Sequence, residues 1–301
     1  MADYTVYFNG EWMPFSQVKI DPMDRGFMLG DVVFEVARTF NGKIFRLEEH
    51  IDRLYKSLKY SRITPDLSAE EMLNISEHVV NINDHLRAEV GDYTVWQFVT
   101  RGPVRWTRSA GPPSVCVRIS PIDFGRFTQY FDQGAHGVIT RTRSYPNESL
   151  DSKIKHHSRM NFNLAELEAS DVDPEAWPIL TDIQGNITEG TGYNIFIVTN
   201  GVIKTPRDNN ILQGVSRKMV FDLSKQLNIP IIEEDIQPYD LYTADEVFFS
   251  STSYCVLPVT KIDNRHIKDR TPGPITQQIL AAWSEIVGVD IIGQALQVYC
   301  G

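Results

Sequence analysis

Polar and hydrophobic residues alternate along the first part of the chain, the pattern typical of half-buried strands. Residues 3–15 (DYTVYFNGEWMPF) predict a β-hairpin, because the Asn-Gly pair at 9–10 suits a two-residue turn. Residues 30–47 repeat this arrangement around the Asn-Gly pair at 41–42. The chain therefore begins with two predicted strand pairs, each with its own turn.

A helical period replaces the alternation in the next part of the chain. Residues 46–61 carry apolar side chains three and four positions apart, at Leu47, Ile51, Leu54 and Leu58. A second helix is predicted over residues 68–86, where Ser68 and Glu71 have the spacing of a capping box. Both helices have an apolar stripe that can pack on the predicted strands.

The pattern divides the chain into two domains. Strands at 92–102 and 114–122 complete a small N-terminal α/β domain, which we place at residues 1–121. Residues 122–133 have no clean period and are interpreted as the linker. Residues 134–301 predict a larger second domain in which strands and helices resume. Its strands are predicted at 137–144, 178–182, 187–206, 230–236 and 246–253, and its helices beyond Ser158 and at 216–228 and 274–288.

Composition agrees with two domains and excludes some partners. The 301 residues are 42% hydrophobic, enough for one large core or two medium ones. A net charge of −10 disfavours nucleic acid and anionic membranes as partners. No run of about 18 apolar residues predicts a membrane span, and the N-terminus lacks the features of a signal peptide. The scattered cysteines, Cys116, Cys255 and Cys300, predict neither disulfides nor a metal site. We expect a soluble, cytoplasmic enzyme.

An unusual group of cations lies in residues 150–169 (LDSKIKHHSRMNFNLAELEA), just before a predicted helix. The helix dipole disfavours positive charge at that end. Lys155 is the residue of interest, because a desolvated lysine has a lowered pKa and its neutral amine can form a Schiff base with a carbonyl. On these residues alone, an ordinary surface lysine is an equally open interpretation.

Three other stretches contain groups that suit a phosphorylated heterocycle. Glu189 lies in a tight loop that can face a protonated ring nitrogen, or can be a solvent-facing turn. Gly214-Val215-Ser216 precede a helix, where backbone N–H groups bind phosphate, although a glycine turn with a serine cap explains them too. A hydroxyl cluster at 250–253 and Arg53 on the helix 46–61 are further candidates for a phosphate clamp.

The order and spacing of these motifs resemble one family. The sequences "DRGFMLGDVVFEVARTFNGKIFRLEEHIDRL", "IK" before "LAELEA", "ITEGTGYNIF" and "LQGVSRK" make the chain similar to the class IV pyridoxal-phosphate (PLP) aminotransferases. The resemblance covers nearly the whole chain. It implies a two-domain α/β (α+β) fold of type IV, with the cofactor in the cleft between the domains. It also implies a homodimer whose pocket is completed by the neighbouring subunit.

The resemblance implies a role for each matching residue. Lys155 would hold PLP as an internal aldimine and move the proton between the substrate Cα and the cofactor C4′. Glu189 would keep the pyridine nitrogen protonated. The phosphate-binding positions match Arg53, Val215, Ser216 and Thr252, with Ser251 in place of a glycine common in relatives. Arg159 falls near the ring O3′, whereas Lys153, His156 and His157 have no implied role.

The resemblance leaves several candidates for the substrate site. Branched-chain enzymes carry a Tyr and an Arg on the strand that here reads Thr94-Val95-Trp96, and this chain lacks that pair. The carboxylate of an amino acid or keto acid could instead meet Arg105 or Arg108 in the following loop, or Arg38. Phe34 and Trp96, together with Leu29 and Trp106, would form an apolar wall.

The favoured function is therefore a ping-pong transaminase that moves an amino group from an (R)-amine or D-amino acid to a keto acid such as pyruvate. A branched-chain L-amino-acid aminotransferase and a lyase resembling aminodeoxychorismate lyase remain open as alternatives on the same fold. A non-catalytic relative is a third possibility, but the lysine and all phosphate-binding positions are present. The expected partners are small molecules and a second copy of the chain.

Overall fold

The computed structural model describes residues 3–104, 111–268 and 272–300. It separates into two compact units. Unit 1 is Met1–Ile122 with Ile154–Arg159, and unit 2 is Asp123–Lys153 with Met160–Gly301. This division differs in two respects from the predicted small domain, linker and large domain. The segment predicted as a linker begins unit 2 at Asp123, and the short segment that contains Lys155 packs with unit 1.

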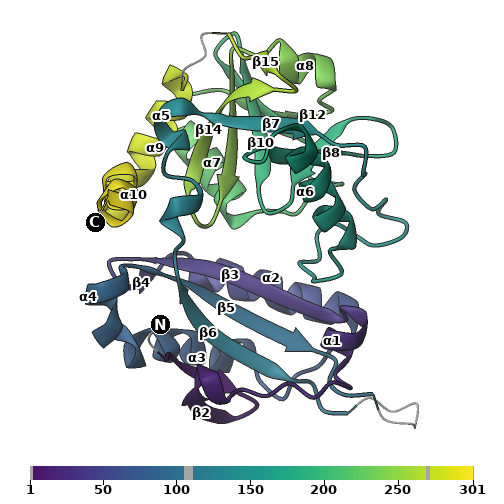
Figure 1. Cartoon of the computed structure of the whole chain (residues 1–301), viewed down its shortest axis with the longest axis vertical. Coiled ribbons are helices and arrows are strands. Elements are labelled where there is room, and N and C mark those ends of the chain that lie inside the picture. Colours follow the sequence, from purple (N-terminus) through teal and green to yellow (C-terminus); the bar gives the residue numbers. More distant parts are fainter. Residues whose placement is uncertain (1–2, 105–110, 269–271, 301) are drawn as a thin grey trace. The chain divides into compact units, whose positions relative to one another are not determined.

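Unit 1 is built on an antiparallel sheet of six strands in the order β2-β1-β6-β5-β3-β4 (Figure 1). The two predicted hairpins are present, and Asn9, Gly10, Asn41 and Gly42 all have the positive φ angles that such turns require. Its strands are β1 (Thr5–Phe8), β2 (Glu11–Pro14), β3 (Val32–Phe40), β4 (Lys43–Ile44), β5 (Tyr93–Thr100) and β6 (Val115–Pro121).

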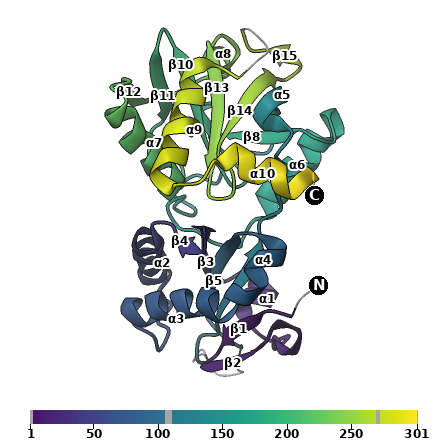
Figure 2. The ribbon, with the colours of Figure 1, turned by 90° about the vertical axis from the view of Figure 1, so that its left-hand side faces the viewer.

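Two helices, α2 (Leu47–Ser61) and α3 (Ala69–Ile82), pack on one face of this sheet and on each other (Figure 2). The predicted apolar stripe of α2 is buried, and Ser68 and Glu71 form the predicted capping box of α3. The predicted second helix is shorter than expected, because residues 84–86 form a 3-10 turn, η2 (Asp84–Leu86). The remaining elements are η1 (Phe15–Gln17), α1 (Arg25–Leu29) and α4 (Arg87–Val90).

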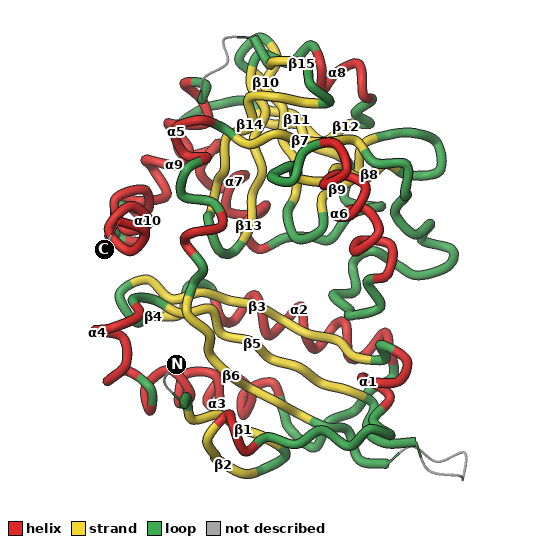
Figure 3. The backbone as a smooth tube through the Cα atoms, viewed as in Figure 1, coloured by secondary structure: helices red, strands yellow, loops and turns green. Residues whose placement is uncertain are grey.

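Unit 2 contains a nine-stranded sheet that bends round until it closes (Figure 3). The strands β10, β13, β14, β7, β8 and β9 follow one another, and β9 then pairs with β10 through Glu189 and Asn194. Its strands are β7 (Ala135–Ile139), β8 (Trp177–Thr181), β9 (Ile187–Gly190), β10 (Asn194–Thr199), β11 (Val202–Pro206), β12 (Ile231–Glu234), β13 (Glu246–Ser251), β14 (Cys255–Ile262) and β15 (Arg265–His266).

Helices cover the outside of this sheet. Helix α6 contacts β8 and β7, while α7 and α9 contact each other and β13. Their bounds are η3 (Phe124–Arg126), α5 (Tyr130–Gln133), α6 (Met160–Val172), α7 (Val215–Gln226), α8 (Pro238–Tyr242), α9 (Pro274–Val287) and α10 (Ile291–Cys300). The sequence pattern missed α10 and the separate strand β14. In the described part of the chain, no single helix is long and apolar enough to cross a membrane; α9 and the start of α10 pass that test only together, with a bend of 83° between them.

Candidate functional site

Lys155 lies in an extended segment, not in the first turn of a helix. The backbone of this segment, Ile154–Arg159, runs beside β3: Phe34 N donates to Lys155 O at 3.0 Å, and His157 N donates to Val32 O at 3.1 Å. Helix α6 begins only after Arg159. The cluster of cations therefore does not oppose the dipole of a helix, and the β3 pairing holds the Lys155 backbone in place.

The side chain of Lys155 points over an aromatic ring. Its Nζ lies 4.7 Å from the ring centroid of Phe34, which is itself buried. The rings of His157 and Phe34 lie 3.9 Å apart. Burial, followed by the charges of Arg159 and Lys155, lowers the pKa of both His156 and His157 to about 4. Both imidazoles are therefore neutral at physiological pH, next to a lysine and an arginine.

Arg53 is held by a buried carboxylate. From α2, its Nε and Nη2 donate to the two oxygens of Glu35 on β3, at 2.6 and 2.8 Å. His50, one helical turn before Arg53, places Nδ1 2.8 Å from the same carboxylate. Glu35 is completely buried. This two-pronged contact fixes the plane of the Arg53 guanidinium, as a phosphate-binding arginine requires.

The protonation of this network follows from its partners. Burial alone would raise the pKa of Glu35, but the charge of Arg53 and the hydrogen bonds from His50 and Arg53 hold that pKa well below its usual value. Burial lowers the pKa of His50, although Glu35 opposes the effect. The sequence analysis singled out neither Glu35 nor His50. The available signal was a glutamate within the apolar run VVFEVA, at a position whose side chain faces the core.

In unit 2, Glu189 and Asn194 lie side by side where the sheet closes. Both are buried. Asn194 Nδ2 donates to Glu189 Oε2 at 3.4 Å and to Leu212 O at 3.0 Å, and Leu212 N donates to Glu189 Oε2 at 3.1 Å. Glu189 is thus not a solvent-facing turn residue, because its carboxylate is built into the interior of the unit. Sequence reasoning did not find Asn194.

The start of α7 lies against the same asparagine. A Cβ added to Gly214 would collide with Asn194 Oδ1, so only glycine permits this approach. Gly214 precedes the helix without a side-chain cap, and Val215 and Ser216 form its buried first turn. The first N–H groups of α7 are therefore available for an anion. The alternative interpretation of Ser216 as a helix cap is wrong, because Ser216 lies within the helix.

The hydroxyl cluster after β13 lies next to these groups. Ser250 pairs with Asn194 across the strands, is 1% exposed, and its Oγ has no hydrogen-bond partner among the described residues. Ser251 donates its hydroxyl to Gly192 O at 3.0 Å. Thr252 follows the strand and is half-buried.

The candidate substrate residues have different surroundings. Arg38 is 2% exposed, and its guanidinium stacks 4.0 Å from the Phe40 ring. Trp96 is half-buried on β5 and donates its ring N–H to Thr94. Arg105 and Arg108 lie outside the described residues.

The predicted site residues thus form two groups. Unit 1 brings together Lys155, Arg53, Arg159, Phe34, Arg38 and Trp96. Unit 2 brings together Glu189, Val215, Ser216, Ser251 and Thr252. No cluster of three or more His, Cys, Asp or Glu side chains that could hold a metal occurs in the described ranges.

Comparison with known proteins identifies the family. The family described as "Amino-transferase class IV" matches residues 32–262. The chain belongs to the class IV aminotransferases. It is 34% identical over 287 residues to the "Putative branched-chain-amino-acid aminotransferase" of Methanocaldococcus jannaschii, covering 93% of this chain and 96% of that protein. It is 30% identical over 285 residues to the D-alanine aminotransferase of Staphylococcus aureus (strain N315), covering 94% and 97%.

Solved structures of the same family have the same fold. The branched-chain aminotransferase of Escherichia coli superposes with a TM-score of 0.84 at 25% identity, over 95% of each chain. A second branched-chain aminotransferase, from T.th. and solved with pyridoxamine 5′-phosphate, superposes with a TM-score of 0.86 at 25% identity, over 99% of this chain and 97% of that chain. The predicted two-domain α/β fold of type IV is confirmed. The protein is a PLP-dependent transaminase.

The residues of unit 2 fit part of this cofactor. A buried carboxylate, Glu189, and the uncapped start of α7 both lie against Asn194. A protonated pyridine nitrogen and a phosphate are the chemical groups that such a pair would bind. The unpartnered hydroxyl of Ser250 on the adjacent strand is a further donor. The donor set therefore suits a phosphorylated heterocycle.

Proposed function

We propose that Lys155 holds PLP covalently and carries the proton at the reacting carbon. When bound, PLP delocalises the electron pair left as the substrate Cα loses its proton. Lys155 Nζ takes that proton and returns it in the next half-reaction, acting as general base and then general acid. The observation that supports this role is the β3 pairing of residues 154–159, which fixes the backbone of Lys155 beside the buried Phe34.

We assign the binding roles to the remaining groups. Glu189 accepts the proton-bearing ring nitrogen of PLP, held in position by Asn194 and Leu212. The phosphate is bound by Arg53, by the first turn of α7 and by Thr252. Ser251 donates to a backbone carbonyl, so we place it beside the phosphate and not on it. We place Arg159 near O3′ of the ring.

We propose that the amino donor is a D-amino acid or an (R)-amine, and the acceptor a keto acid such as pyruvate. The Tyr and Arg associated with branched-chain substrates are absent from the strand that here contains Trp96. D-alanine aminotransferases of Staphylococcus aureus and Bacillus licheniformis are among the relatives, the latter 33% identical over 281 residues. The second candidate is a branched-chain L-amino-acid aminotransferase, which the Methanocaldococcus jannaschii relative favours.

Single-donor half-reactions test this proposal. The purified, PLP-loaded protein is mixed with one donor at a time, without an acceptor, and the visible absorption of the lysine-bound cofactor is followed. The donors are an (R)-arylalkylamine, its (S) enantiomer, D-alanine and L-leucine. We expect loss of the band with the (R)-amine or D-alanine. Rapid loss with L-leucine alone would favour the second candidate, and a cofactor band unchanged by every donor would contradict the proposed function.

We also propose that the protein is a homodimer. Large apolar side chains of unit 1 gather on the surface between residues 15 and 29, where Phe27 is 75%, Leu29 64% and Ile20 63% exposed. A cluster of this kind is typical of an interface between protein chains. Light scattering should give about twice the chain mass of 34.3 kDa, whereas a monomer at micromolar concentration would contradict the proposal. The free cysteines Cys116 and Cys255 support a cytoplasmic location, which cell fractionation tests.

A further inference from the structure

Three aromatic rings form a flat apolar surface on the sheet of unit 1. Phe34, Trp96 and Phe98 lie with ring centroids 5.6 to 6.2 Å apart and planes within 16° of parallel. They lie on the face of the sheet opposite the helices, because Gln97, whose side chain alternates with theirs, donates to Ser76 of α3. We call these three rings the aromatic platform.

Lys155 lies at one end of the aromatic platform, with its Nζ 4.7 Å from the Phe34 centroid. His157, two residues along the same extended segment, contacts the rings of both Phe34 and Phe98. The low pKa of His157 leaves this imidazole uncharged at neutral pH. The edge of the platform that Lys155 shares with His157 therefore has an amine and a neutral ring.

Arg118 lies at the other end. It is directly opposite Trp96 across β5 and β6, and its guanidinium carbon is 5.1 Å from the Trp96 ring and 5.5 Å from the Phe98 ring. Phe15 flanks the same guanidinium at 5.7 Å. Aromatic faces hold the side chain in place but do not neutralise its charge. Its hydrogen bond to Ile119 O, at 3.5 Å, is at the limit of such contacts.

No carboxylate among the described residues forms an ion pair with Arg118, although the side chain is half-buried. Burial accordingly lowers the pKa of Arg118. Two aspartates share its cavity but are bonded elsewhere. Asp24 accepts from Thr100, Ser114 and Gly26 N, and Asp21 accepts from Met23 N. A half-buried cation without an acidic partner is a typical feature of an anion-binding site.

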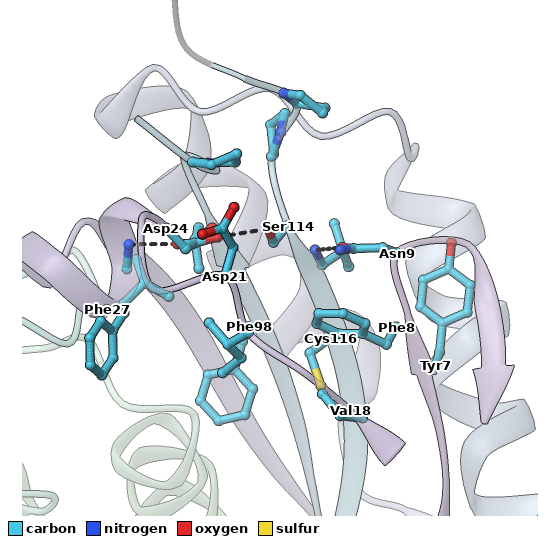
Figure 4. A pocket seen from close by; sticks show the side chains of 18 of the residues that line it. Tyr7, Phe8, Asn9, Val18, Asp21, Asp24, Phe27, Phe98, Ser114 and Cys116 are labelled. Carbon is cyan, nitrogen blue, oxygen red and sulfur yellow. Dashed lines mark hydrogen bonds between the residues drawn. The ribbon is translucent and has the colours of Figure 1, made fainter. Parts of the chain in front are cut away.

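Arg118 faces a cavity large enough for a small organic anion. The cavity has a volume of about 810 Å³ and lies within unit 1. Phe98, His157 and Arg118 line it, so it opens onto the aromatic platform. Figure 4 shows the Phe98 and Cys116 side chains directed into this cavity, with the Asp24 carboxylate turned to Ser114. An apolar chain with a terminal carboxylate matches this combination of flat aromatic surface and cation.

We propose that Arg118 binds the carboxylate of the substrate, while the aromatic platform supports its apolar part. The inference rests on the proposed function, since it places the substrate on the same face as Lys155. It assigns to the enzyme amino acids and keto acids with an apolar or aromatic side chain, and it gives the carboxylate-binding role to a residue of β6. A carboxylate can take two parallel hydrogen bonds from a guanidinium that stacking has already oriented.

A binding titration without turnover tests the role of Arg118. The PLP-loaded protein is titrated with 4-methylvaleric acid and, separately, with its uncharged amide, and heats of binding are measured by calorimetry. In Arg118→Met, we expect affinity for the acid to fall by about tenfold to a hundredfold, the loss of a charged hydrogen bond. Affinity for the amide should change by less than about threefold. Arg118→Lys keeps the charge but not the fork, so an intermediate loss is expected.

The control is Arg126→Met. Arg126 is an exposed arginine of unit 2 that also stacks on an aromatic ring, 5.8 Å from the Trp177 centroid, and its replacement should leave both affinities unchanged. Equal losses for acid and amide in Arg118→Met would mean that Arg118 only supports the rings, and unchanged affinity for the acid would also overturn the inference. The titration does not use turnover, so a failure of the proposed function appears separately, in the donor half-reactions.

Discussion

Lys155→Ala is expected to abolish both covalent retention of PLP and turnover. The substitution removes the only group to which we assign the proton transfer, and such positioned groups contribute about 10²- to 10⁴-fold to rate. The variant should still fold, because Lys155 is half-buried and its backbone bonds to β3 do not involve the side chain. The measurement is the visible absorption of the loaded protein together with the rate of amino-group transfer to pyruvate.

Borohydride reduction followed by peptide mass analysis provides a readout that does not depend on activity. Reduction should fix the cofactor on the peptide that contains Lys155 in the wild-type protein and on no peptide in Lys155→Ala. The matched control is Lys153→Ala. Lys153 is 40% exposed and pairs with Asp151 at 3.5 Å, so its loss should leave both readouts unchanged. A variant Lys155→Ala that kept the band and its turnover would show that another lysine holds the cofactor.

Local chemistry explains what could be predicted from the sequence. The turns at 9–10 and 41–42 were found because Asn-Gly tolerates positive φ with no help from the rest of the fold. The capping box at Ser68 and the stripe of α2 are likewise contained within one helix. The motif order was sufficient for the family, since Lys155, Glu189 and the start of α7 carry its signature.

Long-range register explains what the sequence analysis missed. Glu35 meets Arg53 only because β3 and α2 pack at one particular register, which no local pattern encodes. Arg118 has the alternation of a solvent-facing strand residue, and only the pairing of β5 with β6 places it opposite Trp96. The segment at Lys155 contains no strand period, yet it pairs with β3. Residues that act through partners distant in sequence therefore need the fold.

The largest expected effect on stability comes from Glu35. Replacing it by Ala leaves the guanidinium of Arg53 without its buried carboxylate, and breaking a buried ion pair costs about 3–5 kcal/mol. Glu35→Gln should cost less, because the amide oxygen still accepts a hydrogen bond. Urea unfolding measures both changes. The control is Asp52→Asn on the same helix: Asp52 pairs with Lys56, and both side chains are more than 60% exposed, so the midpoint should hardly move.

The acid dependence separates the charge of Glu35 from its shape. The pKa of Glu35 in the folded protein lies below the usual value of 4.5, so its contribution is complete above that value and is lost as the pH falls towards the folded-state pKa. The difference between wild type and Glu35→Gln should therefore stay constant around neutral pH and shrink below about pH 4. PLP affinity should fall in both Glu35 variants, because Arg53 loses the carboxylate that orients it. Normal stability and PLP affinity in Glu35→Ala would mean that the network neither stabilises unit 1 nor positions Arg53.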